Sequence, residues 1–131
     1  MHIATGAAGG ALVGSRVGAV VLGPVLHYAA DRIPHQDVAS RGFEVRCGVL
    51  GVLALAVVRG PFHPATVGAI ASAAPDLEHV LPLPRPGGRK LFPSHRSVGS
   101  HRPDGVPTSI QLVLAGLVLG AVLGAGLRPG R

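Results

Sequence analysis

Apolar residues in this chain fall into five segments, separated by short stretches rich in arginine, proline, histidine and carboxylates. The segments cover residues 3–15, 17–31, 46–58, 64–74 and 110–127. No stretch shows the strict alternation of apolar and polar residues that is typical of a half-buried strand. The pattern therefore predicts an all-α protein in which residues 1–131 form a single domain of about five helices.

The last apolar segment is the longest. Residues 110–127 contain no charged side chain, and Thr108 or Ser109 is suited to cap a helix at this point. A segment of this length can cross the hydrocarbon core of a bilayer, so we expect a transmembrane helix over residues 109–127. The other four segments are shorter, and their length suits buried bundle helices, re-entrant hairpins or tilted partial spans better than full crossings.

The composition agrees with membrane association. Apolar residues make up 47% of the chain and aromatic residues 3%, and there are 20 glycines. With so few aromatic side chains, we expect helices that pack through small residues, as they do inside bilayers. The expected location is the inner membrane, with the chain multi-pass or partly embedded and membrane lipid as a partner. The single cysteine, Cys47, excludes a four-thiolate zinc site, and its apolar neighbours predict that it is packed.

Histidines and carboxylates gather in two short stretches, residues 27–37 and 75–79, each at the end of an apolar segment. His27 and Asp31 are four residues apart, and Asp76 and His79 are three apart, so each pair lies on one face of a helix. Imidazole and carboxylate groups are ligands for zinc and similar divalent metals. Either pair alone could also be a structural hydrogen-bonded pair or a helix cap.

Chain direction brings the two stretches together. If successive segments run antiparallel, the start of the first, the end of the second, the end of the fourth and the start of the fifth share one end of the bundle. We therefore expect a polar metal pocket at this end, covered by the Pro-rich loop 81–107. The candidate ligands are His2, His27, Asp31, His35, Asp76, His79, His95 and His101. A helical wheel turns Glu78 away from Asp76 and His79, which predicts a solvated side chain; the alternative is a base that lies behind the metal ligands.

Basic residues are concentrated at the same end. The net charge is +6, and the antiparallel arrangement places eight of the twelve basic residues there. The positive-inside tendency then predicts that the site faces the cytoplasm. Arg89, Lys90 and Arg96 lie near the last histidines and could hold a phosphate, or they could equally contact lipid headgroups. No nucleic-acid partner is predicted, because these cations lack interleaved aromatic residues and form no recognition helix.

Four stretches resemble the YdjM-type family of membrane-bound, metal-dependent hydrolases. They are His-Ile-Ala-Thr-Gly-Ala-Ala at 2–8, Leu-His-Tyr-Ala-Ala-Asp-Arg-Ile-Pro-His-Gln-Asp at 26–37, Gly-Ala-Ile-Ala-Ser-Ala-Ala-Pro-Asp-Leu-Glu-His at 68–79 and Phe-Pro-Ser-His-Arg at 92–96. That family is thought to be distantly similar to the helical zinc-dependent phospholipase C and single-strand nuclease superfamily. The resemblance implies that His27 and Asp31 form the family's H-x-x-x-D metal pair. It also implies metal roles for His2, Asp76 and His79.

The resemblance has one departure. The family often carries an H-R-x-x-T-H-S block, whereas residues 94–101 of this chain place His95 and His101 farther apart and lack Thr-His-Ser.

The expected function is hydrolysis of a phosphoester by water activated on one or two divalent metals, with zinc favoured. The alternative is a non-catalytic small membrane protein with a structural metal site or a basic loop that binds lipid or a partner.

Overall fold

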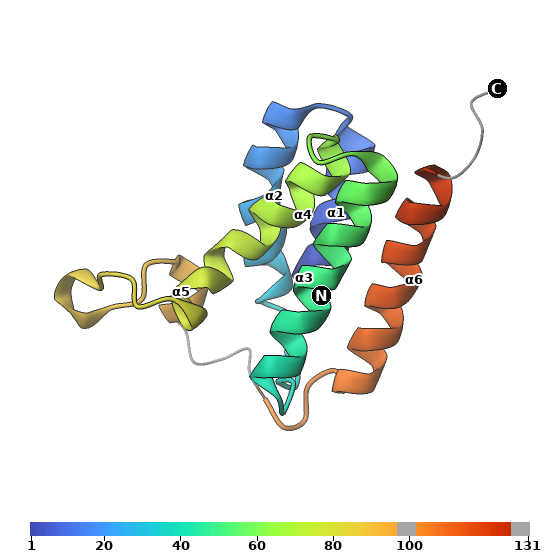
Figure 1. Ribbon diagram of the computed structural model, residues 1–131. Coiled ribbons are helices and arrows are strands. Elements are labelled where there is room, and N and C mark those ends of the chain that lie inside the picture. The colour runs from blue at the N-terminus through green and yellow to red at the C-terminus, as the bar shows by residue number, and fades with distance from the viewer. Residues whose placement is uncertain (97–101, 127–131) are drawn as a thin grey trace.

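The computed structural model describes residues 1–96 and 102–126, and most of them are helical (Figure 1). The helices are α1 (His2–Val13), α2 (Arg16–Ala30), α3 (Arg41–Arg59), α4 (Pro64–Ala73), α5 (Leu77–Val80) and α6 (Thr108–Gly126), with 3-10 turns η1 (Ala74–Asp76), η2 (Pro86–Gly88) and η3 (Pro93–Arg96). The described residues contain no strand beyond an isolated bridge between His35 and Val106. The all-α prediction is therefore confirmed.

Local signals in the sequence explain most helix ends. Gly14 caps the end of α1 with a positive φ of 66°. The Ser15 hydroxyl accepts a hydrogen bond from the backbone amide of Gly18 and so caps the start of α2. Ser40 caps α3 in the same way, so this helix begins at Arg41, before the apolar segment that predicted it. Pro24 lies inside α2, which continues through it from Arg16 to Ala30.

Small residues let α1 and α4 approach closely. A Cβ atom on Gly6 would overlap the carbonyl oxygen of Gly68, and one on Gly10 would overlap the carbonyl oxygen of Pro64. The G-x-x-x-G spacing of Gly6 and Gly10 places both glycines on the face of α1 that meets α4. Buried Ala7, Leu55, Ala65 and Ala69 form the core beside this crossing. Packing through small residues, expected from the composition, is thus confirmed.

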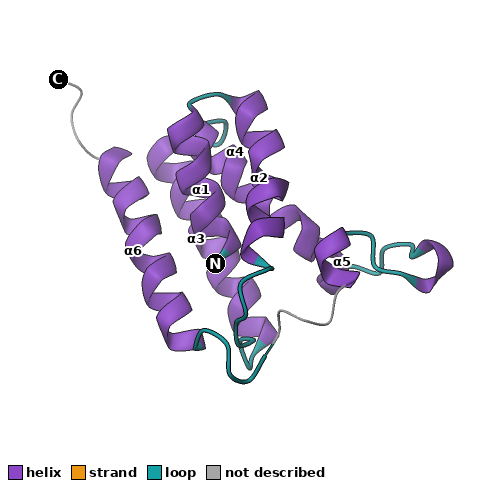
Figure 2. Ribbon diagram, turned by 180° about the vertical axis from the view of Figure 1, so that it is seen from behind, coloured by secondary structure: helices purple, strands orange, loops and turns teal. Residues whose placement is uncertain are grey.

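The helices run in alternating directions (Figures 1 and 2). The start of α1 lies beside the end of α2, since His2 contacts Asp31, and the end of α2 lies beside the turn after α4, since His27 contacts Asp76. The start of α6 lies against the segment after α2, where the Thr108 hydroxyl donates to the carbonyl of Asp37. This is the arrangement that antiparallel alternation predicts.

Within the described residues, α6 is the helix long and apolar enough to cross a membrane by length and composition. It has 19 residues, its most apolar window has a mean hydropathy of 2.0, and none of that window is buried. Helices α1 and α2 are apolar but shorter. Cys47 is exposed on α3, so the prediction of a packed cysteine was wrong: its apolar neighbours in sequence do not make that helix face an internal one.

Candidate metal centre

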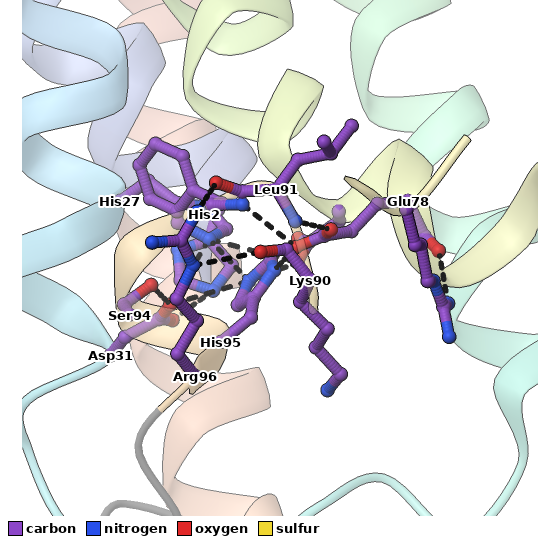
Figure 3. Close-up of polar contacts among 12 residues, drawn as sticks. His2, His27, Asp31, Glu78, Lys90, Leu91, Ser94, His95 and Arg96 are labelled. Atoms are coloured by element: carbon purple, nitrogen blue, oxygen red, sulfur yellow. Dashed lines mark hydrogen bonds and ion pairs between the residues drawn. The ribbon is translucent and has the colours of Figure 1, made fainter. Parts of the chain in front are cut away.

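His27, in the last turn of α2, is fully buried at the centre of a cluster of histidines and carboxylates (Figure 3). Its Nδ1 lies 2.8 Å from the carbonyl oxygen of Ser72 on α4. A carbonyl oxygen can only accept a hydrogen bond, so Nδ1 carries a proton. In the neutral ring, Nε2 is therefore unprotonated, and its lone pair points into the cluster.

His95 comes from η3, in the loop far along the chain, and is held in the matching way. Its Nδ1 donates to the Glu78 carboxylate, which leaves Nε2 as the lone-pair nitrogen of the neutral ring. The two Nε2 atoms of His27 and His95 lie 3.0 Å apart. Two lone pairs repel each other at this distance, so a proton or a metal cation must be shared between them.

Asp31 supplies the buried negative charge of the cluster. Its Oδ2 lies 3.1 Å from Nε2 of His27 and 3.4 Å from Nε2 of His95, and its Oδ1 lies 3.2 Å from Nε2 of His2. The Ser94 hydroxyl also donates to Oδ2. Burial by itself would raise the pKa of Asp31, but hydrogen bonds from His2, His27 and Ser94 hold that pKa well below its usual range. The carboxylate is therefore ionised.

The charge of the cluster also acts on His27. Burial opposes protonation of this ring, but the hydrogen bond to Asp31 and the charges of Asp76 and Asp31 together raise the pKa of His27. The surroundings of His27 therefore favour positive charge at its Nε2. The same negative potential would favour a cation in that place.

Three more predicted ligands complete the cluster. The His2 ring stacks on His27 with centroids 3.9 Å apart, and its Nδ1 is buried without a hydrogen-bond partner. The side chain of Asp76 is 41% exposed, and its Oδ1 lies 3.7 Å and 3.5 Å from Nε2 of His27 and His95. The His79 ring lies 4.3 Å from that of His95.

These side chains form three overlapping groups whose possible ligand atoms lie within 4.8 Å of one another. The groups are His2, His27 and Asp76; His27, Asp31 and His95; and Asp76, His79 and His95. The structure therefore brings together six of the eight predicted ligands, from the ends of three apolar segments and from the loop before α6. The cluster is open to solvent at Asp76 and closed at His27.

Glu78 corrects the sequence analysis, which predicted a solvated side chain. It is 3% exposed, and its carboxylate accepts hydrogen bonds from His95 and from the amides of Leu91 and Phe92. Burial alone would raise the pKa of Glu78, but these hydrogen bonds lower it, so the carboxylate is ionised. The prediction was wrong because the loop folds back over Glu78 and supplies these donors, which a helical wheel does not include.

Two predicted ligands have other positions. His35 lies outside the three groups: its Nδ1 lies 2.7 Å from the carbonyl of Ile33, and its backbone pairs with Val106. Since α2 ends before Pro34, the chain has turned by this point and His35 does not continue the helix face of His27 and Asp31. His101 falls in residues 97–101, outside the described residues.

The predicted phosphate-binding residues all lie on the loop beside His95. The Arg96 guanidinium donates to the carbonyls of Lys90 and Leu91, at 2.8 Å and 3.0 Å. Arg89 is exposed. Lys90 also acts on His79: burial lowers the pKa of His79, and the charges of His95 and Lys90 lower it further, so the His79 ring is neutral. The first part of the loop extends away from the bundle (Figure 1), whereas Leu91, Phe92 and η3 lie against the cluster.

The sequence analysis missed the partners that orient the ligands. The Ser72 carbonyl, Glu78 and Ser94 each hold a ligand residue, and Phe92 packs edge-on against His27 at 5.1 Å between centroids. The one available signal was the Phe-Pro-Ser-His stretch, which places Phe92 and Ser94 next to His95.

Comparison with known proteins adds no relative. No family model matches the chain, and neither a curated protein nor a solved structure matches it. The functional argument therefore depends on the geometry of the cluster.

Proposed function

We propose that this protein is a membrane-associated, metal-dependent hydrolase that acts on a phosphoester. The residues that would hold the metal are His2, His27, Asp31, Asp76, His79 and His95. The observation that carries the proposal is the pair of Nε2 atoms 3.0 Å apart, each on a ring whose Nδ1 already donates to a fixed acceptor. Acceptors that face each other in this way are the arrangement that a cation satisfies.

The donor set fits zinc. Imidazole nitrogens and carboxylate oxygens are common zinc ligands, and Nδ1 of His2, which is buried without a hydrogen-bond partner, adds another nitrogen that could bind a metal. Ligating histidines typically donate their other ring nitrogen to a carbonyl or carboxylate, as His27 does to Ser72 and His95 to Glu78. The exposed edge at Asp76 supports an open coordination position rather than a closed structural site.

A bound divalent cation would lower the pKa of its water toward neutrality and polarise a phosphoryl oxygen. The residues of the chain would orient the reactants around it. Asp76 lies at the open side, where it can accept a proton from an approaching water. Asp31 stays buried and ionised, and Arg89, Lys90 and Arg96 supply positive charge for the phosphate.

Metal analysis of the detergent-purified full chain tests the site. We expect near-stoichiometric zinc or manganese in the wild type and loss of the metal in His27→Ala and Asp76→Ala. The control is Asp104→Ala, which removes an exposed carboxylate paired with Arg102. A metal-free wild type that is as stable as the metal-treated protein would remove the hydrolase proposal.

Phosphodiester and phosphomonoester substrates then separate catalysis from a structural ion. We expect the metal-loaded wild type to hydrolyse one class. Asp76→Asn should keep more of the metal than Asp76→Ala, because its amide oxygen can still face the metal, but it should lose turnover, because an amide cannot take a proton from water. A metal-loaded wild type without turnover on either class would favour the non-catalytic alternative.

Membrane association is proposed for α6. A 19-residue apolar helix with none of its most apolar window buried supports it. So do the exposed large apolar side chains on α2 and α3, which include Val17, Val21, Leu50 and Val57. Alkaline carbonate extraction of membranes from expressing cells should leave the protein in the pellet. Its release to the supernatant would contradict a spanning α6.

A further inference from the structure

The opposite end of the bundle carries an unsatisfied set of hydrogen-bond donors. His63 precedes α4, where its Nδ1 faces the amide of Ala65 at 3.1 Å and its Nε2 faces Nη2 of Arg59 at 3.2 Å. A neutral imidazole has one lone pair and one N–H group. Two donors therefore address a ring that can accept only one of them.

Arg59 has a further unpaired donor. Its Nε is buried without a hydrogen-bond partner. Burial and the charge of Arg59 lower the pKa of His63, so the ring is neutral and contributes no acceptor beyond its single lone pair. Hydrogen-bond donors thus outnumber acceptors around Arg59 and His63. In the metal centre the mismatch is the opposite one, because two acceptor nitrogens of neutral rings face each other.

In the part of the chain that the structure describes, no acidic side chain neutralises this end. All six acidic residues belong to the ends of helices that meet at the metal centre or to the loops there; they are Asp31, Asp37, Glu44, Asp76, Glu78 and Asp104. Within the described residues, Arg59 forms no ion pair. The positive charge of Arg59 and the N–H groups of Arg59 and His63 are therefore complementary to an external anion.

An apolar groove leads to Arg59. Its volume is about 330 Å³, and its walls are small and aliphatic side chains of α1 and α6, including Ala8, Ala11, Ala121 and Val122. Among the described residues that line it, Arg59 is the charged one, and its side chain lies across the last turn of α6, where a Cβ on Gly126 would overlap it. Neighbouring α6 is the candidate membrane-spanning helix.

We propose that this groove binds an anionic phospholipid, with an acyl chain between α1 and α6 and the phosphate on the N–H groups of Arg59 and His63. The apolar walls favour a lipid over free phosphate, since an inorganic ion would leave them exposed to water. This site lies at the other end of the bundle from the metal centre and does not depend on the hydrolase proposal.

Native mass spectrometry of the full chain in detergent tests the site. The probes are phosphatidylglycerol, phosphatidylcholine with the same acyl chains, and inorganic phosphate. We expect preferential binding of phosphatidylglycerol, and a loss of roughly tenfold or more in Arg59→Gln, the effect of removing one charge-assisted hydrogen bond. Arg16→Gln is the matched control, because Arg16 is exposed at the start of α2 and does not line the groove.

Ala121→Leu tests the groove without changing any charge. It adds an apolar side chain at an exposed position of α6 that lines the groove, and should weaken phosphatidylglycerol binding while the circular dichroism spectrum stays unchanged. This variant decides the question if Arg59→Gln does not fold. Equal binding of the two lipids, binding unaffected by either variant, or binding of phosphate without lipid would each overturn the proposal.

Discussion

Replacing Glu78 by glutamine tests how the metal centre is oriented. The carboxylate accepts from His95 Nδ1 and from two backbone amides of the loop. Glutamine offers one acceptor oxygen, and its amide NH₂ would face an N–H group. Losing one charge-assisted bond costs about 1.5–3 kcal/mol. At about 1.4 kcal/mol per tenfold change, zinc affinity should fall roughly 10- to 100-fold.

Competition with a chromophoric zinc chelator measures the change. The matched control is Glu44→Gln, which makes the same substitution at an exposed carboxylate in the first turn of α3. We expect its zinc affinity to equal that of the wild type. If Glu78→Gln retains wild-type affinity and its helical spectrum, the orienting role of Glu78 toward His95 is refuted.

Three further outcomes follow from the geometry. Gly6→Ala should destabilise the protein by about 1–3 kcal/mol in denaturant unfolding, because its Cβ would overlap Gly68, whereas Gly116→Ala, with open space around it, should not. His35→Ala should keep the wild-type metal content, since His35 lies outside the ligand groups, and metal loss in this variant would refute that assignment. Folding lowers the pKa of Asp31, so the ionised carboxylate stabilises the folded protein above the unfolded-state pKa, and this stabilisation is lost as the pH falls through the folded-state pKa. Asp31→Asn should therefore make the stability of the metal-free protein less dependent on pH in acid unfolding, and unchanged unfolding curves would contradict this.

The arrangement of the helices could be predicted from the sequence because it depends on few variables. Five apolar segments joined by short connections favour antiparallel neighbours, and chain direction then determines which ends meet. This was sufficient to bring His2, Asp31 and Asp76 to one end, although they are far apart in the chain. Spacing within one helix likewise placed His27 and Asp31 together, because four residues make about one turn.

The side chains that orient the cluster could not be predicted in this way. Glu78 is buried because Leu91, Phe92 and His95 come from a loop far along the chain, and a helical wheel of residues 76–79 contains none of them. His35 lies beyond the end of α2, and its backbone pairs with Val106, which holds it outside the ligand groups. In both cases the outcome depends on contacts with distant parts of the chain.

The distribution of unpaired groups argues that the two ends of the bundle bind ligands of opposite charge. Every Asp and Glu side chain lies toward one end, where Nε2 of His27 and Nε2 of His95 face each other. At the other end, Arg59 and His63 face each other through N–H groups, with no acidic side chain among the described residues there. Burial makes each mismatch costly, because a buried polar group without a partner loses its hydration with no compensation. A cation at the first end and an anion at the second would remove both costs, and Glu78→Gln and Arg59→Gln each alter one end while leaving the other intact.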